Sequence, residues 1–311
     1  IMTNVKKLGL TALAGSLVAT SAYAGALDVT GTAKVTYASL DESEVTGNPY
    51  SMSQGIGFAG SGDIDDLGTL SYTYTSTNMA FSSSNLKLDM GDNGTVSFAN
   101  GASLTGMQAY YDKMPTAGEQ VWDDLDGQAN GVATMSTTNT LGYSGTFAGI
   151  GISAAYNKDA GTATEGSSKS LALTSSDMID GAEIGWAHAD VSGSTDNNGT
   201  DSDTVYLTYT AGAVTAGVQV TRIDKSAANS DVDRTHAAVS IAVNENLSVS
   251  LGQSIVEFES SSKDDQENVG IAFSYTMGSM TIAGFQNSED NSGGTQGTDD
   301  SVTELSVAFA F

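Results

Sequence analysis

Apolar and polar residues alternate along most of the chain from Leu27 onward. In the segment 27–37 (LDVTGTAKVTY), Val29, Val35 and Tyr37 share one parity, and polar residues share the other. Side chains alternate across a strand with a period of two, so such a run predicts a strand with one apolar face and one polar face. The same pattern recurs at residues 150–156, 184–188, 205–209, 214–220, 237–243, 247–251, 269–275 and 305–311.

The connections between these runs come in two sizes, which alternate along the chain. The short ones are at residues 62–66, 91–94, 176–181, 211–212, 244–246 and 277–279. The long ones are at residues 41–50, 158–168, 191–203, 225–234, 259–267 and 288–300, and the longest, residues 102–138, follows the fifth strand. Short turns on one rim and long loops on the other are typical of an up-and-down meander. We expect 16 strands, with 14 or 18 as alternatives, and an even number places both chain ends at the short-turn rim.

The first 24 residues have the pattern of an export signal. Lys6 and Lys7 precede an apolar stretch at residues 8–19, and residues 22–24 (AYA) offer the small–x–small site of a signal peptidase. We therefore expect residues 1–24 to be a signal peptide and residues 25–311 to be the folded domain. Past the signal, the sequence contains no apolar stretch near the ~18 residues that a spanning helix needs.

Composition excludes several classes of function. The chain has 11 Lys and Arg against 37 Asp and Glu, a formal charge of −26, and it has no Cys. Nucleic acid is excluded as a partner because phosphate binding needs a basic face. The lack of Cys removes disulfides, thiolate metal sites and Cys nucleophiles. Intrinsic disorder does not fit, because 39% of the residues are hydrophobic and alternate in strand-like runs.

The last strand favours a membrane barrel over a soluble β-sandwich. Leu305, Val307, Phe309 and the terminal Phe311 share one parity, so the chain ends in an amphipathic strand. In lipid every backbone N–H and C=O must be paired, so a sheet can span only if it closes. Its outer face then needs an apolar band about 25 Å tall with aromatic girdles. We expect an all-β fold, a transmembrane antiparallel up-and-down β-barrel.

The signal peptide, the 16-strand meander, the long third loop and the terminal Phe311 together resemble the Gram-negative general diffusion porins, particularly the alphaproteobacterial type. The resemblance covers the mature chain. It implies an outer-membrane location, a homotrimer with one water-filled pore in each chain, and a third loop that folds inward to narrow the pore. It also implies contact with lipopolysaccharide, and with the assembly machinery that reads a C-terminal signal such as Phe309 and Phe311.

The third loop carries the candidate constriction. It holds one basic residue, Lys113, against five acids: Asp112, Glu119, Asp123, Asp124 and Asp126. Lys34 and Lys87 have the polar parity of the first and fourth strands and would face this loop from the opposite wall. Carboxylates at a constriction lower the energy of passing cations and raise that of anions. We expect a passive, weakly cation-selective channel for small hydrophilic solutes and ions.

Other functions remain open. A substrate-selective porin is one, and a non-conducting surface or adhesin barrel with a plugged lumen is another. An outer-membrane hydrolase would need a His base beside a nucleophile. His188 shares the outward parity of Trp186, which indicates an interface residue, and His236 has no evident partner in the sequence, so we expect no enzyme. We expect no cofactor, although the acidic outer segments 196–203 and 261–267 offer oxygen ligands for weak Ca²⁺ or Mg²⁺ binding.

Overall fold

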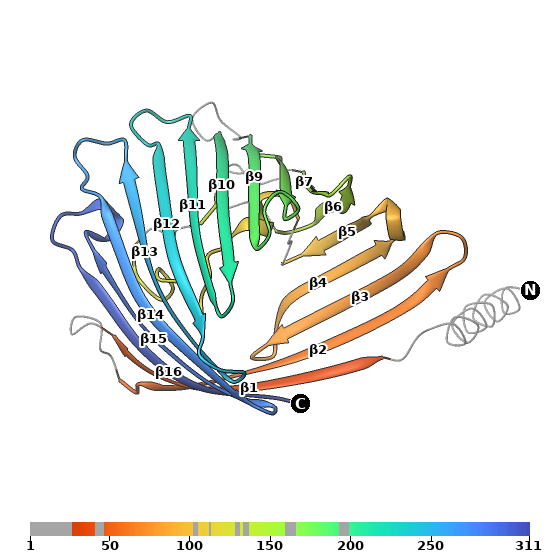
Figure 1. Cartoon of the computed structure of the whole chain (residues 1–311), viewed down its shortest axis with the longest axis horizontal. Coiled ribbons are helices and arrows are strands. Elements are labelled where there is room, and N and C mark those ends of the chain that lie inside the picture. The colour runs from red at the N-terminus through yellow and green to blue at the C-terminus, as the bar shows by residue number, and fades with distance from the viewer. Residues whose placement is uncertain are drawn as a thin grey trace, which may run out of the picture.

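Sixteen antiparallel strands follow one another in chain order and close into a barrel (Figure 1). The structure is a computed structural model, and it describes residues 27–40, 47–101, 105–111, 113–127, 131–132, 137–158, 166–192 and 199–311. The expected signal peptide, residues 1–24, lies outside these residues. Because each strand pairs with its neighbours in sequence and the last pairs with the first, the predicted all-β, up-and-down barrel of 16 strands is confirmed.

The strand boundaries follow the runs of alternating residues. The strands are β1 (Asp28–Leu40), β2 (Tyr50–Ile64), β3 (Gly68–Thr77), β4 (Ala80–Asp89), β5 (Thr95–Asn100), β6 (Thr140–Phe147), β7 (Ile150–Asn157), β8 (Ser168–Ser175), β9 (Ala182–Val191), β10 (Thr200–Ala211), β11 (Val214–Lys225), β12 (Val232–Ala242), β13 (Leu247–Phe258), β14 (Gln266–Met277), β15 (Met280–Asp290) and β16 (Asp300–Ala310). Three short 3₁₀ segments lie between strands: η1 (Gly91–Asn93), η2 (Gly106–Tyr110) and η3 (Ser292–Gly294). No helix in the described part of the chain is long and apolar enough to cross a membrane.

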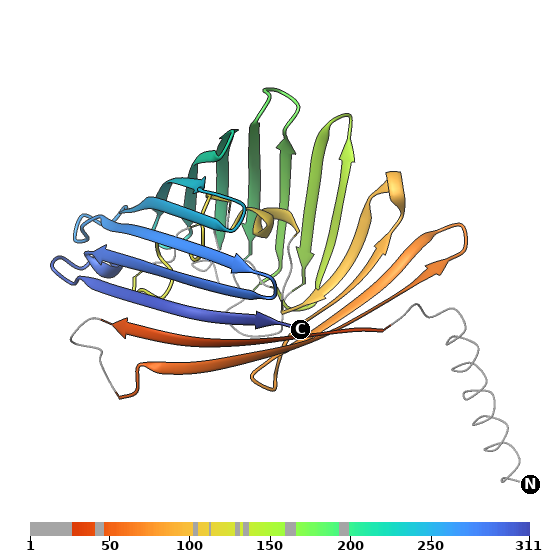
Figure 2. The same ribbon diagram turned by 60° about the horizontal axis from the view of Figure 1, so that its bottom comes forward.

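The barrel closes where the beginning of β1 meets the end of β16 (Figure 2). Gly31 and Phe311 exchange two backbone hydrogen bonds, at 2.6 Å and 2.9 Å. A Cβ atom on Gly31 would lie 2.2 Å from Cε2 of Phe311, so any larger residue requires the terminal ring to move. Both ends of the barrel domain therefore lie at the short-turn rim, as an even strand count requires.

The two faces of the barrel wall differ in polarity. The outward parity exposes large apolar and aromatic side chains, among them Val35, Trp186 and Phe309. The inward parity is polar or small, and Thr204 of β10 hydrogen bonds Thr221 of β11 across the strands at 2.8 Å. Since lipid cannot satisfy polar groups, the apolar outer face and the polar inner face match a barrel in a membrane.

One connection departs from the expected alternation of short turns and long loops. On the long-loop rim, β3 and β4 are joined by only two residues, Asn78 and Met79. Their φ angles are 51° and 65°. Positive φ at both central residues is the geometry of a type I′ turn, which matches the twist of a two-stranded hairpin. The expectation that every connection on this rim is long is wrong here. A type I′ turn usually has the sequence Asn-Gly, and this one has Met79 in place of the glycine, so the sequence did not indicate a tight turn.

Candidate functional site

The connection between β5 and β6, residues 101–139, is called loop 3 below, and it folds against the inner face of the barrel. Its described part lies inside the curve of the strands (Figure 1). The backbone N–H of Gly106 donates to Ser153 Oγ of β7 at 2.8 Å, and that of Met107 donates to Ser170 Oγ of β8 at 3.1 Å. Gly106 has φ 62°, and a Cβ there would lie 2.0 Å from Ser170 Oγ. Glycine therefore permits this close approach of loop to wall.

Tyr110 anchors the first turn of loop 3. Its hydroxyl donates to the carbonyl of Leu173 at 2.6 Å and lies 2.8 Å from Thr174 Oγ1. Its own carbonyl accepts from Gln219 Nε2 of β11 at 3.2 Å, and its ring meets Tyr206 edge-on at 4.7 Å. Burial raises the pKa of the Tyr110 hydroxyl, which therefore stays a neutral donor. These contacts hold the loop to β8, β10 and β11.

Lys113 of loop 3 is held by a wall carboxylate. Its Nζ lies 3.0 Å from Oε1 of Glu183 in β9. The same oxygen accepts the Tyr206 hydroxyl at 2.5 Å, and the Lys113 ammonium lies 5.1 Å from the centre of the Tyr206 ring. The positive charge of Lys113 is therefore compensated locally.

The second half of loop 3 continues along the wall to the last strands. The backbone N–H of Ala117 donates to Ser250 Oγ of β13 at 2.8 Å. Asn287 Nδ2 of β15 donates to the carbonyl of Gln120 at 2.9 Å, and the N–H of Asp126 donates to Asp300 Oδ2 of β16 at 2.8 Å. The described part of loop 3 thus follows the inner wall from β7 round to β16.

Trp122 of loop 3 stacks on His236 of β12. The two ring centres are 4.2 Å apart and the ring planes are inclined by 24°. Both rings are buried, and neither ring nitrogen of His236 has a hydrogen-bond partner among the described residues. This histidine holds the loop to the wall. His188 instead lies on the outer face, 3.2 Å from Asp203 Oδ1.

The predicted constriction acids occupy different positions on loop 3. Glu119, Asp124 and Asp126 are exposed. Asp123 is half-buried, and its Oδ2 accepts the backbone N–H of Gln120 at 2.6 Å, which stabilises the turn. Asp112 lies outside the described residues. Loop 3 therefore presents at least three carboxylates to solvent.

The wall lysines face the lumen, as their parity predicts. Lys34 Nζ lies 2.8 Å from Oε1 of Glu304 in β16, and Glu119 and Asp124 are within electrostatic range of it. Lys87 lies opposite Ser97, an inward-facing residue of β5, and is exposed. Within the described residues no carboxylate lies within 4.0 Å of Lys87. One of the two lysines is thus compensated and the other is not.

A model of the Gram-negative porin family matches residues 9–309. The chain is a Gram-negative porin. Membership of this family makes it an outer-membrane channel for small solutes, and it bears out the resemblance carried by the meander and the terminal Phe311. No curated protein matches the chain by sequence.

Solved structures agree with this assignment at the level of fold. A mutant of the Rhodopseudomonas blastica porin has a TM-score of 0.66 and 14% identity, and the alignment covers 92% of this chain and 100% of that one. OmpT, an outer membrane protein of Vibrio cholerae in its trimer form, has a TM-score of 0.69 and 12% identity, covering 93% of this chain and 100% of that one. At these identities the likeness shows the barrel architecture only.

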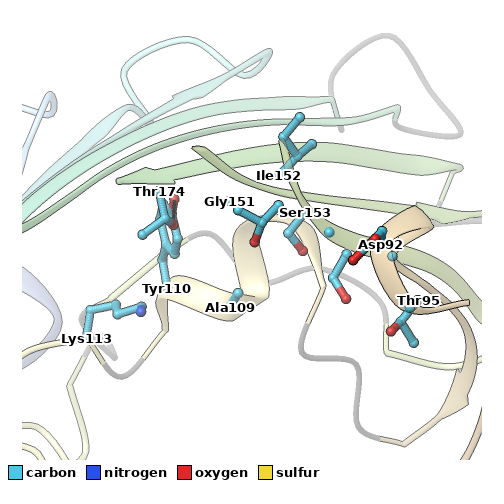
Figure 3. A pocket seen from close by; sticks show the side chains of 14 residues that line it. Asp92, Thr95, Ala109, Tyr110, Lys113, Gly151, Ile152, Ser153 and Thr174 are labelled. Carbon is cyan, nitrogen blue, oxygen red and sulfur yellow. Dashed lines mark hydrogen bonds between the residues drawn. The ribbon is translucent and has the colours of Figure 1, made fainter. Parts of the chain in front are cut away.

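An open chamber of about 720 Å³ lies between loop 3 and the wall, near the short-turn rim. Figure 3 shows Tyr110 and Lys113 on one side of it and Asp92 and Thr95 on the other. Hydroxyl groups and glycine backbone of β6–β8 make up most of the remaining lining. At ~30 Å³ per molecule the chamber holds on the order of 20 waters, so small hydrophilic solutes fit beside the loop.

Sequence reasoning missed the wall carboxylates that matter most to the charge of the lumen. Glu183 compensates Lys113, Glu304 compensates Lys34, and Asp300 holds the loop backbone. The alternation along the last strand could have indicated one of them, because Glu304 lies between the outward-facing Thr303 and Leu305 and must therefore face inward. Charge counting along loop 3 alone could not find these partners, because they lie on strands far away in the sequence.

Proposed function

We propose that this porin is a passive, cation-preferring channel for small hydrophilic solutes and ions. The observation that carries the proposal is the unequal compensation of charges facing the lumen. The ammonium groups of Lys113 and Lys34 each have a carboxylate within 3.0 Å. Glu119, Asp124 and Asp126 are exposed carboxylates on loop 3, and no cation lies within 4.0 Å of them in the described residues.

The sign of the remaining charge sets the expected preference. Three carboxylates of loop 3 are exposed, and of the two predicted wall lysines only Lys87 has no carboxylate within 4.0 Å among the described residues. A negative field in a narrow, low-dielectric passage attracts cations and repels anions. The preference is weak because water in the lumen screens each charge.

The test is the reversal potential of the purified protein in a planar bilayer, with a tenfold KCl gradient across the membrane. We expect a potential of the sign that K⁺ permeation gives. A potential of the opposite sign would overturn the proposed selectivity without affecting the barrel. Absence of conductance in correctly folded protein would favour the non-conducting surface barrel instead.

The proposal includes a homotrimer in the outer membrane, in contact with lipopolysaccharide. Likeness to a trimeric barrel of the same architecture supports it. We also propose that the C-terminal residues Phe309 and Phe311 are read by the outer-membrane assembly machinery. Weak Ca²⁺ or Mg²⁺ binding at the acidic outer loops stays a prediction. Among the described residues no group of three or more His, Asp or Glu is arranged to hold a metal ion.

A further inference from the structure

Three cations gather at one point of the long-loop rim, in a chain where acids outnumber bases by 37 to 11. They are Lys225 at the end of β11, Arg234 at the start of β12 and Lys263 between β13 and β14. Lys225 lies within electrostatic range of both of the others. Four other basic residues each have a carboxylate within 4.0 Å, but within the described residues none of these three has one.

Two of the three cations, Lys263 and Arg234, make other contacts. Lys263 Nζ lies 4.2 Å from the centre of the Phe258 ring and donates to the carbonyl of Gly293 at 2.6 Å. Arg234 donates to the carbonyl of Val132 in loop 3 at 3.3 Å, and its buried Nε has no partner in the described surroundings. Lys263 and Arg234 are therefore positioned by carbonyl dipoles and a ring face, with no carboxylate within 4.0 Å in the described residues.

A carboxylate beside these cations already accepts a hydrogen bond. Asp231 lines the same cavity as Lys225 and Lys263, and its Oδ1 accepts the backbone N–H of Lys225 at 2.7 Å. The N–H of Asp231 in turn donates to Glu259 Oε2 at 3.2 Å. Asp231 and Glu259 therefore reduce the charge of the cluster, but three cations against these two carboxylates leave it positive.

Lys225 and Lys263 border a cavity of about 170 Å³. Its other lining residues include Asn229, Val232 and Phe258. Val232 and Phe258 pack with the buried apolar cluster that holds loop 3, so the cavity lies on the lumen side of the wall. At ~30 Å³ per water it holds five or six waters, which is room for a small oxyanion with part of its hydration shell.

We propose that this cavity is a phosphate-type oxyanion site at the extracellular mouth of the channel. Like charges held close together repel unless a counter-charge joins them, and Lys ammonium groups bind phosphate through charge-assisted hydrogen bonds. A dianion bridging Lys225 and Lys263 supplies that counter-charge. The occupant is a free phosphate or a phosphomonoester solute, because the cavity adjoins the lumen rather than the lipid.

The test measures binding of inorganic phosphate to refolded protein free of lipopolysaccharide, by ³¹P line broadening at constant ionic strength. We expect saturable binding to the unaltered protein. The double variant Lys225→Gln/Lys263→Gln should bind phosphate about tenfold more weakly, since two charge-assisted contacts are lost. The matched control is Lys169→Gln, which removes a lysine paired with Asp190 on the outer face. It should bind phosphate normally.

A second arm separates the two sources of phosphate. Lipid A in detergent micelles is offered in place of inorganic phosphate, with the same variants and with heat-modified electrophoretic mobility as the folding check. Binding of inorganic phosphate that depends on the two lysines supports the proposal. Unchanged binding in the folded double variant would overturn it, and so would no binding of phosphate by the unaltered protein. Binding of lipid A alone would overturn the lumenal site and assign the cluster to the lipid surface.

Discussion

Removing the charges of Glu119 and Asp124 together should abolish the cation preference of the channel. Both side chains are exposed on loop 3 and lie within electrostatic range of Lys34 of β1. The substitutions Glu119→Gln and Asp124→Asn keep the size of each side chain and remove its charge. Asp126 and Lys87 then remain, so the charge summed over the three exposed loop 3 carboxylates and Lys87 falls from −2 to zero.

The magnitude follows from the charge balance. One charge acting on an ion at ~7 Å in water contributes about 0.6 kcal/mol, which falls to ~0.25 kcal/mol with a Debye length of ~8 Å. Two uncompensated carboxylates then favour K⁺ and disfavour Cl⁻ by ~0.5 kcal/mol each. The difference of ~1 kcal/mol corresponds to a K⁺/Cl⁻ permeability ratio of roughly five, which the double variant should lower to about one.

The assay is the reversal potential in a KCl gradient at two ionic strengths. The matched control is Asp201→Asn/Asp203→Asn, which removes two charges from the outer parity of β10 and should leave the ratio unchanged. If the loop 3 variant keeps the ratio of the unaltered protein, these carboxylates do not line the ion path. If the outer-face control changes the ratio as much, the preference comes from the surface charge of the whole barrel.

Three further outcomes are expected. Glu183→Gln removes the counter-charge of Lys113 and should lower the K⁺/Cl⁻ permeability ratio. Tyr206→Phe keeps that ion pair, so it should leave the permeability ratio unchanged and lower the unfolding free energy by about 1 kcal/mol. Equal permeability ratios in the two variants would contradict this. Gly31→Val places a side chain within 2.2 Å of the Phe311 ring and should lower the unfolding free energy of the refolded barrel, measured by urea titration, by about 1–3 kcal/mol, with partial recovery on adding Phe311→Ala. Met79→Gly relieves a φ of 65° in the β3–β4 turn and should raise the same free energy by about 1 kcal/mol, and a lowered value would refute the turn geometry.

The alternation of apolar and polar residues predicted most of the fold. The alternation around Lys34 placed its side chain inward, and the alternation ending at Phe311 indicated an amphipathic closing strand. Both hold in the barrel. The turn at Asn78 and Met79 was missed because its backbone geometry is imposed by the pairing of β3 with β4, and the local sequence contains no glycine.

The candidate site was predictable only in part. Loop 3 was predicted from its length and its acids. Glu119 is exposed, and its role in a constriction stays a prediction. The pairing of Lys34 with Glu304 depends on β16 closing against β1, and no local pattern reports a contact between the two ends of the chain. His236 had no visible partner in the sequence because Trp122 reaches it only when loop 3 lies on the wall.

The inward position of loop 3 can be tested directly with an engineered disulfide. The chain has no Cys, and a Cβ on Gly118 would lie 3.6 Å from the Cβ of Ala272 in β14, within the range that a disulfide requires. The Gly118→Cys/Ala272→Cys variant should form this disulfide in folded protein, shown by peptide mapping, and should still give discrete conductance steps in a planar bilayer. Two free thiols in folded, conducting protein would contradict a loop that lies along the inner wall and borders the ion path.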